Sequence, residues 1–518
     1  MGSVKYSIKK NTYYDSVTLM IISKEIKKMD GVEEALVGMG TDLNKELATN
    51  LQMSNSEIDE LTPNDFFISV LGDDKVNIEE VVAEVDNLLN AKKKDSDSDY
   101  MPPTLDSAVN NDPDANMVVI SLPGQYAAEE AKKALNKGLN VMLFSDNVKI
   151  EEEKELKELA KSKGLLMMGP DCGTAIINNV PLAFANVVRK GSIGVVGASG
   201  TGTQEITVLI DRLGEGVSQV IGTGGRDLKE EIGGIMMLMG IDALINDPNT
   251  EVIVLVSKPP APSVAEKVLK VVKDSPKPVV VNFIGGDREV VEKYGGYSCI
   301  SLEDAARKAV ALVRKEEVKD FDGFSLAEEE INRIVDQEVA KITSGQKYLR
   351  ALYTGGTIAD ESMKLLGKDF DIYSNIPLSP EFKLENSMVS KENTCLDLGE
   401  DEFTKGKPHP MIDPSYRTER LVQEAKDEEV AVILMDFVLG YGANEDPIGE
   451  MLPSLKEAKE MMAKEGRYLC IVGYVCGTES DPQKLKESQE RLEEAGVIVM
   501  PSNAQAARLT GLILNKIQ

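Results

Sequence analysis

The chain has 518 residues, a formal net charge of −29 and a hydrophobic fraction of 42%. This length favours three or four domains over one core. The negative charge argues against nucleic-acid binding, which needs a basic surface. No apolar run approaches the ~18 to 20 residues that span a membrane, and the N-terminus lacks the apolar core of a signal peptide. Five cysteines without a CxxC pair are typical of reduced thiols, so we expect a cytoplasmic enzyme with a small ligand.

The N-terminal part of the chain is expected to form a small α/β domain, for example a ferredoxin-like one. Its predicted strands are residues 4–8, 32–37 and 66–71, and its predicted helices are residues 16–29 and 78–89. The following stretch, residues 93–116, is rich in serine, aspartate and proline and is predicted to be a linker. We therefore place the first domain at residues 1–92.

From Met117 onward, predicted strands and helices alternate, which is typical of parallel sheets covered by helices on both faces. We divide this region into a partial Rossmann-like domain (117–190), a flavodoxin-like module (191–314), a charged connector (315–346) and a second flavodoxin-like module (347–518). Residues 367–418 are predicted to form a long loop, which is usually either functional or disordered. The fold class is therefore α/β throughout.

Glycine-rich turns follow several of the predicted strands. One turn, residues 197–202, leads from a buried strand into an apolar-periodic helix, and others lie at residues 222–226 and 354–357. A strand, a glycine turn and a helix N-terminus together form an anion site, because free N–H groups and the helix dipole face one point. A glycine turn can also simply let a strand meet a helix. The doubled turn and the hydroxyls of Ser199, Thr201 and Thr203 favour a phosphate or carboxylate site.

The motifs of the middle and C-terminal regions resemble succinyl-CoA synthetase. Gly169-Pro170-Asp171-Cys172-Gly173 and the turns at residues 194–205 and 222–227 are similar to its α subunit. Residues 353–357, 432–437 and 473–479 are similar to the C-terminal ligase module of its β subunit. Both halves lie on one chain here, together with the N-terminal segment 10–16 and the segment 406–414. In this combination nearly the whole chain resembles the FdrA family. The resemblance implies a CoA-binding-type domain at residues 117–190 and two modules that direct their helix N-termini at one phosphate site.

The sequence departs from the synthetase pattern at several points. Residues 284–288 contain no histidine where the synthetases carry phosphate on one, and Lys258 stands where they have the glutamate that orients it. The first strand, turn and helix of a CoA-binding domain have no counterpart before Met117, and an ATP-grasp domain is absent. These departures weaken the expectation, implied by the resemblance, that CoA binds, and no other cofactor is expected.

The FdrA resemblance implies a subunit of a carbamoyl- or acyl-phosphate transferase, such as oxamate carbamoyltransferase of allantoin breakdown. That enzyme exchanges carbamoyl phosphate and oxamate with oxalurate and phosphate. One alternative is an ADP-forming acyl-CoA synthetase whose nucleotide-binding half is a partner subunit. Another is a non-catalytic subunit that senses a metabolite or assists assembly. Expected partners are an acyl or carbamoyl phosphate, a carboxylate and other subunits of an oligomer, but neither nucleic acid nor a membrane.

Candidate site residues follow from the turns and the resemblance. Backbone N–H groups are expected to hold phosphate with help from two hydroxyls, and further turn glycines and one amide are expected to line the site. These residues are Ser199, Gly200, Thr201, Gly224, Gly225, Asn282, Gly355, Gly356 and Thr357.

Three side chains are candidates for catalysis. Lys258 and Arg226 would neutralise charge on the transferred group and on phosphate, unless Arg226 pairs with a carboxylate or Lys258 lies at the surface. His409, between two prolines, is either an acid–base group or a structural loop histidine. Cys172 and Cys476 end strands at glycine turns but have no neighbouring base in the sequence. We expect no metal site.

Overall fold

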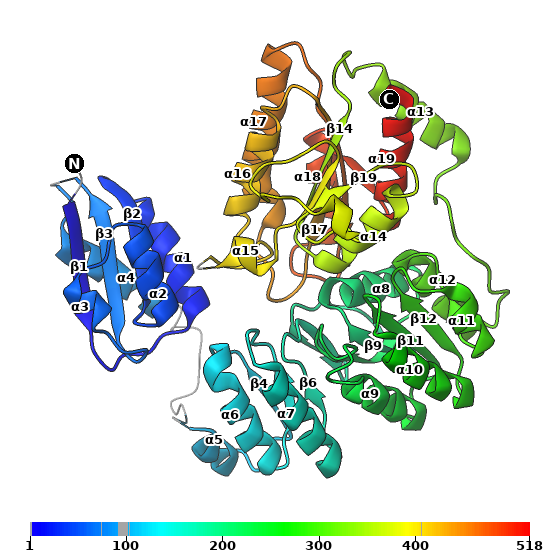
Figure 1. Cartoon of the computed structure of the whole chain (residues 1–518), viewed down its shortest axis with the longest axis horizontal. Coiled ribbons are helices and arrows are strands. Elements are labelled where there is room, and N and C mark those ends of the chain that lie inside the picture. The colour runs from blue at the N-terminus through cyan, green and yellow to red at the C-terminus, as the bar shows by residue number, and fades with distance from the viewer. Residues whose placement is uncertain (1–2, 74, 92–101, 103, 406) are drawn as a thin grey trace. The chain divides into compact units, whose positions relative to one another are not determined.

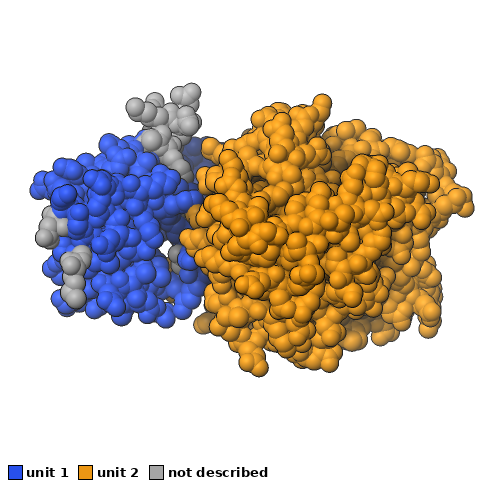
Figure 2. Space-filling view, turned by 90° about the horizontal axis from the view of Figure 1, so that it is seen from above, with its two compact units in different colours: residues 1–113, 401–409 blue, residues 114–400, 410–518 orange. Residues whose placement is uncertain are grey.

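The computed structural model describes residues 3–73, 75–91, 102, 104–405 and 407–518 (Figure 1). The chain forms two compact units, residues 1–113 with 401–409 and residues 114–400 with 410–518 (Figure 2). None of the helices formed by these described residues is long and apolar enough to cross a membrane.

The first unit is built on a three-stranded antiparallel sheet. Its elements are β1 (Ser3–Lys9), α1 (Ser16–Lys27), β2 (Val32–Met39), α2 (Asp42–Asn50), α3 (Ser56–Asp59), β3 (Phe66–Gly72), α4 (Ile78–Ala91), α5 (Leu105–Asn111) and α15 (Asp401–Thr404). The strand order is β1-β3-β2. Phe66, Ile68 and Val70 of β3 pack with α1 and α4, whereas Phe67 packs with residues of α2 and α3. The small α/β domain predicted here is confirmed.

The predicted linker, residues 93–116, lies partly outside the described residues. Its second half contains the helix α5, whose start is capped by the side chain of Thr104.

The second unit begins with three parallel strands, in the order β4-β5-β6. The elements are β4 (Met117–Ile120), α6 (Gly124–Asn136), β5 (Asn140–Leu143), α7 (Ile150–Lys163) and β6 (Met167–Met168). The turn after β4 is closely packed, because a Cβ on Gly124 would lie 2.6 Å from the carbonyl oxygen of Asn147.

A seven-stranded sheet follows, in the order β13-β12-β11-β9-β10-β7-β8. Its strands are β7 (Thr174–Ile177), β8 (Val180–Ala183), β9 (Lys190–Ala198), β10 (Val217–Gly222), β11 (Val252–Ser257), β12 (Val279–Phe283) and β13 (Tyr297–Ser298). Its helices are α8 (Gly200–Arg212), α9 (Ile235–Asn246), α10 (Pro262–Asp274), α11 (Arg288–Lys293) and α12 (Leu302–Arg314). All neighbouring strands are parallel except the pairs that involve β7. This antiparallel hairpin precedes residue 191, where the sequence predicts the module to start.

The C-terminal sheet has six parallel strands in the order β15-β16-β14-β17-β18-β19. The strands are β14 (Tyr348–Tyr353), β15 (Tyr373–Ser374), β16 (Thr394–Asp397), β17 (Val430–Val438), β18 (Cys470–Cys476) and β19 (Ile498–Met500). The helices are α13 (Glu328–Val339) in the connector, then α14 (Gly356–Leu366), α16 (Ser415–Glu424), α17 (Pro447–Lys464), α18 (Leu485–Glu494) and α19 (Asn503–Ile517), with a 3-10 turn at Pro380–Phe382. The predicted α/β fold class is confirmed.

The long loop predicted at residues 367–418 is wrong. This segment contains β15 and β16, and β16 pairs directly with β14. The two strands are two and four residues long, too short for the alternation of polar and apolar residues that reveals a strand.

The two modules of the second unit share one hydrophobic core. Ile206 and Leu209 of α8 belong to the same buried cluster as Ile358 of α14 and Leu509 of α19. Polar contacts also join them, because the backbone N–H of Asn503 donates to Glu205 Oε1 at 3.1 Å. Arg212 donates to the carbonyl oxygens of residues 475, 477 and 501. Helix α8 is therefore fixed against the C-terminal module.

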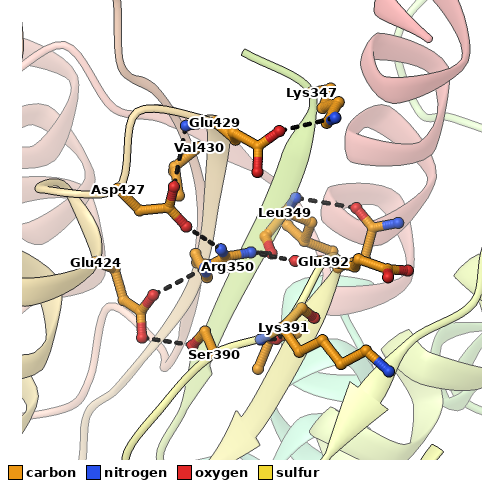
Figure 3. Close-up of polar contacts among 12 residues, drawn as sticks. Lys347, Leu349, Arg350, Ser390, Lys391, Glu392, Glu424, Asp427, Glu429 and Val430 are labelled. Carbon is orange, nitrogen blue, oxygen red and sulfur yellow. Dashed lines mark hydrogen bonds and ion pairs between the residues drawn. The ribbon is translucent and has the colours of Figure 1, made fainter. Parts of the chain in front are cut away.

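A buried arginine organises the N-terminal edge of the C-terminal sheet (Figure 3). Arg350 of β14 is 1% exposed, and its guanidinium contacts Glu424 at 2.8 Å and Asp427 at 2.5 Å. It also donates to the carbonyl oxygens of Leu349 and Glu392. One side chain thus links β14 to the end of α16 and to the segment before β16.

We predict that Arg350→Ala lowers the free energy of unfolding of the second unit by about 1–3 kcal/mol, because the buried Glu424 would lose one of its two ion pairs and keep only that with Arg420. Urea denaturation of the full chain, followed by circular dichroism, measures this loss. Lys347→Ala removes the exposed ion pair between Lys347, just before β14, and Glu429, just before β17, and should leave the midpoint unchanged. Equal midpoints for both variants would contradict the structural role of Arg350.

Candidate functional site

The N-termini of α8 and α14 meet at the carboxyl ends of β9 and β14. Ser199, the N-cap of α8, accepts a hydrogen bond from the N–H of Gly202 at 3.0 Å. The Ser199 hydroxyl in turn donates to Thr357 Oγ1 at 2.7 Å. Helix α14 starts at Gly356 without a side-chain cap, which leaves its first N–H groups available to a ligand or water. The two predicted phosphate turns are therefore brought together.

At the contact between the two helix starts, positions 202 and 355 have no room for a side chain and therefore need glycine. A Cβ on Gly355 would lie 2.5 Å from Oγ1 and 2.7 Å from Cβ of Thr201. A Cβ on Gly202 would lie 2.7 Å from Cγ2 of Thr357. Each helix start carries a partial positive charge of about half a unit, so their contact is favourable only with negative charge nearby.

A buried ion pair between Asp436 and Arg417 fixes the turn before α14. Asp436 of β17 accepts hydrogen bonds from the N–H of Thr354 at 3.0 Å and from its hydroxyl at 2.6 Å. The same carboxylate pairs with Arg417 at 2.8 Å. Asp436 is fully buried and serves to fix this turn.

Lys258 reaches the start of α14 from the end of β11. Its Nζ lies 3.1 Å from Asp360 Oδ2 and 3.2 Å from where a Cβ on Gly356 would be. Burial alone would lower the pKa of Lys258, but the carboxylates of Asp360 and Asp397 outweigh it and raise the pKa. A charged ammonium therefore stands beside the paired helix starts, and Lys258 is not an isolated surface lysine.

Two carboxylates at the start of α14, those of Asp397 and Asp360, were not predicted from the sequence as site residues. Asp397, at the end of β16, would overlap a Cβ on Gly356. Burial and, after it, the charge of Glu400 raise the pKa of Asp397 to about 7. Asp360 lies in the first turns of α14, and burial raises its pKa as well. Asp397 ends a parallel strand, which is a usual signal for a site residue, but its segment was predicted to be a loop.

Asn282 lies close to the same place. It is the last residue but one of β12 and is 3% exposed. It is in register with Val256 of β11, whose Cγ2 lies 3.4 Å from where a Cβ on Gly202 would be. Its side chain forms no hydrogen bond with any residue the structure describes. Its role as a ligand contact stays a prediction.

Arg226 is engaged away from these helix starts. It forms an ion pair with Glu153 of α7 at 2.9 Å and donates to the carbonyl oxygen of Val148 at 2.7 Å. Glu153 also binds Lys157, which contacts Asp227 at 2.8 Å. Of the two alternatives for Arg226, the carboxylate pair is the one observed.

Gly224 and Gly225 also have a packing role. Gly224 has a φ of +82°, and a Cβ there would overlap the carbonyl oxygen of Pro170. A Cβ on Gly225 would lie 3.4 Å from Asp171 Oδ2. This turn therefore packs on residues 169–171 instead of meeting α14.

The remaining candidates are buried or belong to the other unit. His409 is part of the first unit, and burial lowers its pKa to about 4, so its imidazole is neutral near pH 7. Burial raises the pKa of Cys172 to about 12 and also raises the pKa of Cys476. These thiols stay protonated, which removes the basis for a thiolate nucleophile. Among the described residues, no group of three or more histidine, cysteine or acidic side chains is arranged to hold a metal ion.

Comparison with known proteins shows that the chain is similar to CoA ligases. Three family models match: "AllF, heavy metal-associated domain" over residues 1–103, "CoA binding domain" over residues 188–285, and "CoA-ligase" over residues 352–513. The middle match covers β9 to β12, not residues 117–190, where the resemblance predicts a CoA-binding-type domain.

The chain is also similar to individual proteins over different shares of its length. The uncharacterized protein YahF of Escherichia coli (strain K12) is 48% identical over 513 residues, 99% of this chain and 98% of that protein. A succinate–CoA ligase [ADP-forming] subunit alpha 2 of Archaeoglobus fulgidus is 25% identical over 205 residues, 39% of this chain and 69% of that protein. A dinucleotide-forming acetyl-coenzyme A synthetase 1 of Ca. Korarchaeum cryptofilum, in its apo form, is 16% identical over 77% of this chain and 83% of that chain, with a TM-score of 0.31.

These findings define a member of the acyl-CoA synthetase superfamily, as the resemblance predicts. Within that superfamily the chain belongs to the same family as YahF.

The heavy-metal-associated match is not accompanied by ligands for a heavy metal. Residues 1–103 contain neither cysteine nor histidine, the two side chains that soft and borderline metals prefer. The match is therefore no evidence that this domain binds a heavy metal through cysteine or histidine.

We predict that Gly355→Ala lowers the stability of the second unit by about 1–3 kcal/mol, because the added methyl group has no room beside Thr201. The backbone of Gly355 has a φ of −127°, so alanine meets only this steric obstacle. Denaturant unfolding of the full chain measures the effect, and the double variant with Thr201→Gly should recover most of it.

The matched control is Gly323→Ala, where nothing lies within 4 Å of the added Cβ. A Gly355→Ala variant as stable as Gly323→Ala would contradict the contact between the two helix starts.

Proposed function

We propose that this chain is a subunit of a transferase that moves a carbamoyl or acyl group between phosphate and an acceptor carrying a carboxylate. The reaction we favour is that of oxamate carbamoyltransferase, in which carbamoyl phosphate and oxamate exchange with oxalurate and phosphate. The observation that carries the proposal is the contact between the N-termini of α8 and α14 with Lys258 beside it.

The geometry suits a small dianion. Backbone N–H groups of Gly200, Thr201, Gly356 and Thr357 would bind the phosphate oxygens, and the ammonium of Lys258 would balance their charge. Such donors are in place before the reaction and stabilise charge on the leaving phosphate in the transition state.

The sequence of the middle module supports direct transfer. Residues 284–288 after β12 contain no histidine to carry a phosphoryl group, and Lys258 replaces the expected partner of such a histidine. Carbamoyl transfer from carbamoyl phosphate needs neither a phosphohistidine nor CoA. The match of residues 1–103 to the AllF domain also agrees with a role in allantoin breakdown.

A second candidate is an ADP-forming acyl-CoA ligase that works with a nucleotide-binding partner subunit. The matches to the CoA binding and CoA-ligase models favour it, as does the similarity to a succinate–CoA ligase subunit. CoA is a substrate in that reaction, and residues 188–285, which match the CoA binding model, would bind it.

One assay separates the candidates. Phosphate release is measured with the full chain, alone and together with proteins that copurify with it. Release that requires both carbamoyl phosphate and oxamate supports the transferase, whereas ATP hydrolysis that requires CoA and a carboxylic acid supports the ligase. Binding of carbamoyl phosphate without turnover supports a sensing or assembly subunit.

We predict that Lys258→Ala weakens binding of carbamoyl phosphate about 10- to 100-fold, because a hydrogen bond to a charged group contributes about 1.5–3 kcal/mol. Calorimetric titration of the full chain measures the affinity. Lys270→Ala, which removes an exposed lysine paired with Glu266 on α10, is the control. If Lys258→Ala binds carbamoyl phosphate as tightly as the wild type, Lys258 does not contact the phosphate.

A further inference from the structure

Asp397 presents one uncommitted carboxylate oxygen at the start of α14. The residue is 4% exposed, and its Oδ1 accepts a hydrogen bond from the N–H of Gly399 at 2.9 Å. Its Oδ2 accepts none from the described part of the chain and lies beside Gly356, where it would overlap an added Cβ. A carboxylate oxygen of a buried residue, without a hydrogen bond among the described residues, therefore faces the place where the phosphate would bind.

The backbone of Asp397 is held rigidly. The side-chain amide of Asn375, a buried residue, donates to the carbonyl oxygen of Asp397 and accepts from its N–H, both at 3.0 Å. Strand pairing with Tyr353 of β14 adds to this. The carboxylate is thus fixed in one position relative to the turn at Gly355.

The charges around Asp397 come from three elements. Lys258 follows β11 and is ion-paired with Asp360 of α14. Glu400 follows Asp397 along the chain, and its negative charge raises the pKa of Asp397. The amide dipoles of α14 add positive potential. Because Lys258 is held by Asp360, Asp397 keeps an oxygen that is free to take up a proton.

A carboxylate beside a phosphate site is unfavourable if phosphate binding is the only task, since the two negative charges repel each other. The placement is explained if the group exchanges a proton during the reaction. We propose that Asp397 is the general base that removes a proton from a nitrogen nucleophile of the acceptor, and that the acceptor class is therefore a primary amide or amine. This inference rests on the transferase function proposed above.

The proton balance of the step is complete. The nitrogen lone pair attacks the carbamoyl carbon, a C–N bond forms, and the bond between that carbon and the phosphate oxygen breaks with its electron pair. The nitrogen loses one proton to Asp397 Oδ2, and Asp397 then gives this proton to the departing phosphate. No metal, oxidant or further reactant is required by this balance.

The need for a base excludes acceptors whose attacking atom carries no proton, and the amide nitrogen of oxamate, the acceptor of the proposed reaction, meets it. The lone pair of an amide nitrogen is delocalised, and the nitrogen must lose a proton as the new bond forms. A carboxylate or thiolate acceptor carries no such proton. With a pKa of about 7, Asp397 is populated in both protonation states near neutral pH, as a base that later acts as an acid requires.

The test is the pH profile of phosphate release from carbamoyl phosphate and oxamate, with the full chain and its copurifying partners. Asp397→Asn should lower kcat about 100-fold or more, while KM for carbamoyl phosphate changes less than about threefold. Glu400→Gln should shift the acidic limb of kcat/KM to lower pH, because the Glu400 charge raises the pKa of Asp397.

The control is Asp446→Asn, which removes an exposed carboxylate at the N-cap of α17, where asparagine caps equally well. It should leave kcat and the pH profile unchanged. If the wild type turns over and Asp397→Asn keeps its kcat, or Glu400→Gln leaves the limb in place, the role of Asp397 is wrong and the transferase function stands. If the wild type releases no phosphate, the transferase function itself fails.

Discussion

The contact between the N-termini of α8 and α14 is the constraint on which the rest of the second unit depends. Two helix ends of like partial charge are brought against each other, and only glycine at positions 202 and 355 allows the approach. The Ser199–Thr357 hydrogen bond closes the contact. The carboxylates of Asp360 and Asp397 near the start of α14 offset part of this repulsion, and a bound anion would offset more of it.

The surrounding structure holds this contact in place. Parallel strands direct the glycine turns to one edge of each sheet, and the ion pair of Asp436 with Arg417 anchors the turn before α14. Across the module interface, the fully buried Glu205 of α8 accepts from the backbone of Asn503. Burial raises the pKa of Glu205 to about 8, so the interface holds a neutral carboxylic acid near pH 7. The site is therefore carried by rigid elements, as preorganised binding of a small anion requires.

Much of this organisation could be predicted from the sequence, because the glycine turns, hydroxyls and alternating strands are local patterns. The pairing of residues 199–201 with residues 355–357, implied by the resemblance, agrees with the observed geometry. What failed depends on long-range contacts. The partner of Arg226 is Glu153 on α7, and no local pattern reveals that pair. Asp397 escaped notice because β16 has four residues and lies within a polar stretch.

The central claim is that the paired helix starts bind phosphate together with Lys258. An experimental structure of the chain with bound carbamoyl phosphate, or with a phosphonate analogue of it, tests this most directly. We predict phosphate oxygens in contact with the N–H groups of Gly200 and Gly356 and with the Lys258 ammonium. A ligand bound at residues 222–226, or anywhere away from the two helix starts, would contradict the account.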